Sequence, residues 1–163
     1  MLVLTLIWGL IGLVVSCWWL VVKLEKSNFE GEGRGGFLRL SNHLVEKLEV
    51  YQLAEKLADE IWNIVSVWQY FEKDTVGKQI VRSADSIGAN IAEGNGRYSY
   101  KDNQRFIRIA RGSLNETRHW LRRAYIRKLL TQEQIDNLKP IIEELTLKLN
   151  GYLRYLKNAS TNH

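Results

Sequence analysis

Apolar side chains recur at intervals of three and four residues through four successive stretches of this chain. In the stretch over residues 44–70 they are Leu53, Leu57, Ile61, Ile64 and Trp68. This spacing places them on one face of an α-helix and leaves the opposite face polar. The 163 residues include a single proline, and no stretch alternates apolar and polar residues as a strand does. The sequence therefore predicts an all-α protein.

The breaks between the stretches carry residues that begin and end helices. Asp74 is predicted as the N-cap of a second helix over residues 75–96, which a Gly-Asn-Gly run ends. In this helix Ala84, Gly88 and Ala92 lie four residues apart, so we expect a neighbouring helix to approach closely there. Ser99 with Asp102 resembles a capping box and opens a third helix over residues 100–128.

A fourth helix is predicted over residues 132–157, opened by a capping box of Thr131 and Gln134. Pro140 should kink this helix or mark its true start after a short turn. Because all three connections are short, consecutive helices are expected to be antiparallel neighbours. The prediction is an antiparallel up-down-up-down four-helix bundle over residues 43–158, followed by a disordered tail at 159–163.

The N-terminal segment, residues 1–22, carries no charged side chain, and Lys23 and Lys26 follow it. A helix of this length crosses a hydrocarbon core of about 30 Å, and the lysines favour a cytoplasmic C-terminal domain. We therefore expect an apolar helix outside the bundle, joined to it by a flexible linker over residues 23–42. Two interpretations stay open. The segment anchors the protein in the inner membrane, or it is leader sequence from an over-extended start and the protein is cytoplasmic.

The third helix concentrates positive charge. Nine basic and two acidic residues lie between Lys101 and Lys128, for a net charge of +7, whereas the whole chain carries +5. Arginine forks match phosphate geometry, so the stripe predicts a nucleic-acid-binding surface. Its alternatives are a plain solvated face, or a face paired with the acidic first helix of the same or another subunit. The predicted binding residues are Lys101, Arg105, Arg108, Arg111, Arg118, Arg122 and Arg123.

Two segments carry a family resemblance: RSADSIGANIAEGNGR at residues 82–97 and FIRIARGSLNE at residues 106–116. They resemble a bacterial four-helix-bundle family. It includes proteins encoded in intervening sequences of large-subunit rRNA genes and accessory proteins of diversity-generating retroelements. The resemblance implies a bundle that assembles into a ring, commonly a pentamer. For the retroelement relatives it implies binding of nucleic acid and a reverse transcriptase. Gly88 stands where relatives often have proline, and the apolar N-terminus is outside the family pattern.

The second helix has a polar face that a bundle core does not need. Its residues Ser86, Asn90, Glu93 and Arg97 are predicted to form a subunit interface; nucleic-acid contact and plain surface are the alternatives. In the third helix Gly112 costs roughly 1 kcal/mol relative to alanine, and close helix packing is its predicted reason.

Residues that would carry catalysis or bind a metal are sparse. The chain has one cysteine and three histidines far apart in sequence, which excludes an internal disulfide and gives no zinc-type ligand cluster. No nucleophile–base pair falls at helical spacing. We therefore predict no enzyme activity, no metal and no cofactor. The predicted function is a homo-oligomeric RNA-binding bundle, and the alternative is a scaffold that docks a partner enzyme such as a reverse transcriptase.

Overall fold

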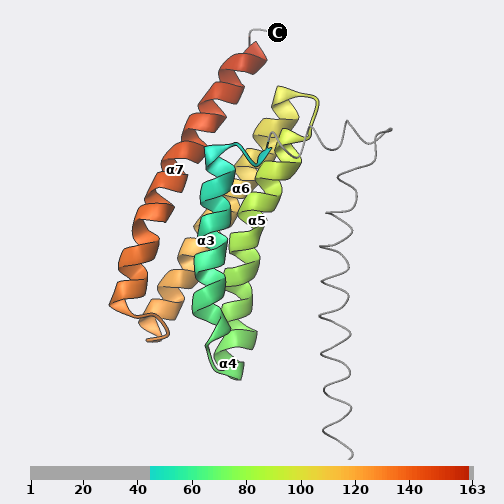
Figure 1. The fold of residues 1–163 in the computed structure, drawn as a ribbon. Helices are drawn as coiled ribbons and strands as arrows, with labels where there is room; N and C mark the ends of the chain where they lie inside the picture. The colour runs from blue at the N-terminus through green and yellow to red at the C-terminus, as the bar shows by residue number, and fades with distance from the viewer. Residues whose placement is uncertain (1–44, 162–163) are drawn as a thin grey trace, which may run out of the picture. The chain divides into compact units, whose positions relative to one another are not determined.

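The computed structural model describes residues 45–161, which form a bundle of four long helices (Figure 1). They are α3 (Glu49–Ser66), α5 (Lys78–Asn95), α6 (Tyr100–Ile126) and α7 (Gln132–Thr161). Each packs on the next along the chain, and α7 also packs on α3. The described residues contain no strand, so the all-α prediction is confirmed. The predictions for residues 1–22 and 23–42 lie outside the described residues.

Pairs of contacting residues show that the neighbouring helices are antiparallel. Across α5 and α6, Thr117 Oγ1 donates a 3.0 Å hydrogen bond to Ser83 Oγ, and a Cβ atom on Gly94 would lie 2.8 Å from Asn103 Oδ1. Across α6 and α7, Gln104 Nε2 donates to Ser160 Oγ at 3.3 Å, and Arg118 bonds to Thr146. Higher numbers on α6 thus meet lower numbers on α7, as in the predicted up-down topology.

The bundle core consists of the predicted apolar stripes. Each long helix contributes side chains that are at most 1% exposed, and burying each such side chain stabilises the fold by about 1.5–3 kcal/mol. The largest fully buried aliphatic side chains are Leu57, Ile61, Ile80, Ile87, Ile91, Ile107, Leu114, Leu145, Leu149 and Leu156.

Both capping predictions for the later helices are confirmed. Ser99 Oγ accepts from the backbone N–H of Asp102 at 3.1 Å, and its hydroxyl donates to the Asp102 carboxylate at 2.7 Å. Gln134 N–H donates to Thr131 Oγ1 at 3.2 Å, while Thr131 N–H donates to Gln134 Oε1 at 2.9 Å. Pro140 lies inside α7, which begins at Gln132, so the alternative in which Pro140 marks the helix start is wrong.

The predicted junction between the first two helices is wrong. Helix α3 ends at Ser66, with Val67 as its C-cap. A new helix begins at Tyr70: α4 (Tyr70–Glu72) and a π-helical turn (Lys73–Gly77) lead directly into α5. Asp74 lies in that turn and caps nothing. At the other end α7 continues to Thr161, so the tail predicted over 159–163 is helical through residue 161.

Two glycines differ in what surrounds them. A Cβ atom on Gly88 would make ordinary contacts, 3.7 Å from Tyr51 Cε2 and 3.9 Å from Ala54 Cβ, so α3 packs against α5 there but leaves room for an alanine. A Cβ atom on Gly112 would meet nothing within 4 Å. The predicted close packing at Gly112 is therefore wrong, because that glycine lies on the outer surface of α6.

The α3–α5 contact gives a pH-dependent prediction. Partial burial, and secondly the nearby charge of Asp59, raise the pKa of Asp85 above its ordinary value. The folded state therefore favours the protonated carboxyl, and the protein loses stability as pH rises through the raised pKa. We expect Asp85→Asn to raise the melting temperature at pH 7 and to lose this advantage below about pH 4. Thermal unfolding at both pH values, with Asp59→Asn as a milder variant in the same direction, checks this. An advantage that persists unchanged at acid pH would contradict it.

Candidate nucleic-acid interface

Three α6 arginines are held by uncharged acceptors. Arg108 Nη2 donates to Gln104 Oε1 at 3.2 Å, one turn earlier on the same helix. Arg111 Nη1 donates to Asn150 Oδ1 at 3.4 Å, and Arg118 Nη2 donates to Thr146 Oγ1 at 3.0 Å, both on α7. A guanidinium has five N–H donors, so one neutral acceptor orients it without reducing its charge.

The ion pairs of the described residues lie outside the α6 stripe of basic side chains. Within residues 45–161 the ion pairs join Glu93 to Arg97 and Glu49 to Lys148, and neither contains an α6 residue. The sequence alternative that pairs the α6 arginines with the acidic α3 of the same subunit is therefore not found in the described part of the chain. Among the described residues, no carboxylate forms an ion pair with the α6 arginines.

A groove of about 570 Å³ runs between the N-terminal half of α6 and the C-terminal half of α7. We call it the cationic groove. Arg108 and Arg111 line it from α6, and Arg154 and Lys157 line it from α7. Gln104, Leu147, Asn150 and Leu153 complete the lining. No carboxylate is among these residues, so the groove has a local charge of +4.

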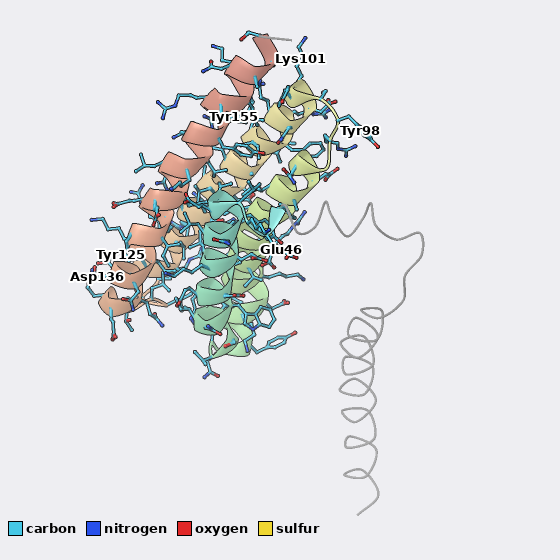
Figure 2. The ribbon with its side chains drawn as sticks, turned by 45° about the horizontal axis from the view of Figure 1, so that its top comes forward. Glu46, Tyr98, Lys101, Tyr125, Asp136 and Tyr155 are labelled. Carbon is cyan, nitrogen blue, oxygen red and sulfur yellow. The ribbon has the colours of Figure 1, made fainter. Side chains whose placement is uncertain are left out.

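The predicted binding residues divide between several places. Arg108 and Arg111 line the cationic groove, whereas Arg118 and Arg122 line a second groove between the same two helices, of about 480 Å³. Lys139 and Glu143 of α7 also line the second groove, so its charge is less one-sided. The remaining three lie elsewhere on α6 and are Lys101, Arg105 and Arg123. Figure 2 labels Lys101 near the start of α6 and, for orientation, Tyr125 near its end.

Sequence reasoning missed Arg154 and Lys157. Helix α7 has equal numbers of basic and acidic residues, so no charge excess drew attention to it. The spacing of Asn150, Arg154 and Lys157 at four and three residues was a usable signal, because it places all three on one helix face. Which helix that face meets depends on the packing of the bundle.

The polar face of α5 is hydrogen-bonded largely within its own helix. Ser86 Oγ donates to the Arg82 carbonyl at 2.7 Å, and Asn90 Nδ2 donates to the Ser86 carbonyl at 2.6 Å. Arg97 pairs with Glu93 and places its guanidinium carbon 4.8 Å from the centre of the Phe106 ring. The Glu93–Arg97 part of the signature thus ties α5 to α6. Its predicted role in a subunit interface stays a prediction.

A groove of a different character lies between α3 and α5. Its volume is about 820 Å³, and Trp62, Val65, Val81 and Ala89 give it an apolar lining. Trp62 is 62% exposed and Tyr70, beside it, 83%. This exposure excludes Trp62 from the bundle core.

Within the part of the chain that the structure describes, every helix is too short or too polar to cross a membrane. The same residues bring no three His, Cys, Asp or Glu side chains together as a metal site.

These features define an antiparallel four-helix-bundle protein with a cationic groove on one side and an apolar groove on another. Residues 46–151 match the family model described as 23S rRNA-intervening sequence protein, and the chain belongs to this family. A solved structure from Bacteroides thetaiotaomicron, a protein of unknown function from the S23 ribosomal protein family, matches with a TM-score of 0.60 at 29% identity. The match covers 64% of this chain and 95% of that one. No curated protein matches. None of these findings supports the retroelement branch of the resemblance.

Proposed function

We propose that this protein is a non-enzymatic, homo-oligomeric RNA-binding bundle that contacts phosphates through α6 and its groove with α7. The observation that carries the proposal is the set of α6 arginines oriented by neutral acceptors, with no carboxylate partner in residues 45–161. Such guanidinium groups are free to make charge-assisted bonds to phosphate oxygens. Because the chain belongs to a family named for 23S rRNA, we take RNA as the polyanion that this surface binds.

A gel shift with structured RNA at two salt concentrations tests the proposal. Phosphate contacts release counterions, so binding should weaken steeply as salt rises. Failure to bind at low salt, or an affinity indifferent to salt, would refute it.

The salt dependence also locates the contacts. Replacing Arg108, Arg111, Arg118 and Arg122 by glutamine should reduce the slope of log affinity against log salt by about 3 units, because each lost phosphate contact removes about 0.7–0.9. The matched control replaces Lys47, Lys56, Lys73 and Lys78, all exposed and outside α6, by glutamine. Both variants lower the net charge from +5 to +1. Equal slopes for the two variants would show that only the total charge matters.

Self-association through the polar face of α5 is the second element of the proposal, and the family resemblance makes a pentameric ring the expected form. Ser86 and Asn90 are half-buried and Glu93 and Arg97 exposed, which leaves this face accessible to another subunit. Native mass spectrometry should give five times the mass of the chain without RNA, and that mass plus the bound RNA when RNA is present. A monomer at micromolar concentration, or a ring unaffected by Asn90→Arg, would contradict this interface.

The apolar α3–α5 groove favours a second candidate function: a scaffold that docks a partner enzyme, such as a reverse transcriptase. Exposed apolar groups of this size commonly mark protein interaction sites. Co-purification with the product of a neighbouring gene, lost in Trp62→Ala, would support it, since the exposed Trp62 contributes little to the core. Co-purification that survives Trp62→Ala would count against this groove.

A further inference from the structure

We propose that the cationic groove holds the backbone of a single RNA strand, with Arg154 and Lys157 of α7 as its second wall. This inference rests on the proposed RNA-binding function and specifies its site and substrate class. Its basis is the position of four cations on two facing walls, Arg108 and Arg111 against Arg154 and Lys157.

The groove is oriented in advance for an anion. Gln104 is 7% exposed, accepts from Arg108 and donates to Ser160 of α7, so one buried amide links an arginine to the opposite helix. Asn150 holds Arg111 in the same way from α7. Ordering a free arginine side chain costs conformational entropy, and part of this cost is already met before the ligand arrives. Gln104 and Asn150 are therefore positioning residues, and the arginines are the contact residues.

The shape of the groove favours a single strand over a duplex. The groove has a volume of about 570 Å³ and lies between two adjacent helices, whose axes normally pack about 8–10 Å apart, so it is too small to admit a duplex. A single backbone that lies in it meets cations on both sides. A duplex is a wide, stiff body that touches only the outer edge, and its bases are stacked inside. Leu147, 71% exposed, and Leu153 offer apolar contact to riboses or unstacked bases, which only a single strand presents.

Fluorescence anisotropy with a mixed-sequence single strand and with the matching duplex tests the proposal on the full chain. We expect the single strand to bind more tightly. The double variant Arg154→Gln/Lys157→Gln should lose at least tenfold in affinity for the single strand. The control Lys47→Gln/Lys56→Gln removes the same charge from two exposed positions outside the groove and should lose less than threefold.

The outcomes distinguish the groove proposal from the more general proposal that the protein binds RNA. Binding of RNA with the duplex preferred, or equal losses for the two double variants, overturns the groove proposal and leaves RNA binding intact. No binding of either RNA at low salt overturns both.

Substitutions of Asn150 test whether this side chain positions Arg111 for RNA, because a purely structural role would not change the salt dependence of binding. Asn150→Ala removes the acceptor but no charge, so we expect affinity to fall about threefold with an unchanged salt slope. Asn150→Asp keeps an acceptor but neutralises Arg111, so affinity should fall more than tenfold and the slope by about one unit. Conservative Asn150→Gln should restore most of the affinity. If Asn150→Asp binds RNA as well as the original protein, the groove is not the site.

Discussion

Leu145→Ala should lower the free energy of unfolding by about 2–5 kcal/mol, the usual range for a buried leucine. Leu145 is completely buried and lies on the stripe by which α7 packs into the bundle. Removing its isobutyl group forfeits the transfer free energy of the apolar atoms and leaves a cavity that the surrounding helices fill only in part. Urea unfolding followed by circular dichroism, with the slope against urea compared between variants, measures the loss.

The matched control is Leu147→Ala, two residues further along the same helix. Leu147 is 71% exposed, so the same chemical change should alter stability by less than about 0.5 kcal/mol. Similar losses of unfolding free energy for Leu145→Ala and Leu147→Ala would show that α7 does not pack into the bundle through the face that contains Leu145. The pair also separates folding from binding, because Leu147 lines the cationic groove and Leu145 does not.

Local sequence signals predicted most of the fold. Period-three-and-four spacing placed Leu57 and Ile61 in the core, and both are buried. The caps at Ser99 and Thr131 were also predictable, because a capping box is a contact among residues three apart. These features depend on neighbours in the chain, which a single sequence displays.

The errors arose where distant residues decide the outcome. Asp74 has the chemistry of an N-cap, yet the helix begins earlier at Tyr70. Gly77 lies so close to α3 that a Cβ atom there would be 2.6 Å from Val65 Cγ1, and this contact belongs to the π-helical turn that contains Asp74. Gly112 was assigned close packing because a mid-helix glycine often needs it, but that side of α6 faces away from the bundle.

The candidate site was half predictable for the same reason. Charge counting identified the α6 arginines, since they are dense in one segment. It did not identify Arg154 and Lys157, because their importance depends on the antiparallel register that sets them beside Arg108 and Arg111. Nor could it identify the neutral acceptors Asn150 and Thr146, which lie 39 and 28 residues from their arginines.

Gly94→Ala is expected to destabilise the bundle by about 1–3 kcal/mol, the usual cost of overpacking. Gly94 is buried near the end of α5, inside the signature segment. A Cβ atom there would lie 2.8 Å from Asn103 Oδ1 and 2.9 Å from Phe106 Cβ. The Phe106 atom is next to the backbone and cannot swing aside, so α5 and α6 would have to separate. That separation would also disturb the contact of Arg97 with Phe106.

Gly88→Ala on the same helix is the control, with an opposite sign. Its Cβ atom would make ordinary contacts at 3.7 and 3.9 Å, and alanine is favoured over glycine in a helix interior by about 0.8–1.0 kcal/mol. We therefore expect Gly88→Ala to be neutral or stabilising in the same urea titration. Stabilisation by both substitutions would mean that α6 does not approach α5 closely at Gly94. The signature glycine would then need a reason outside the single chain, such as contact with another subunit.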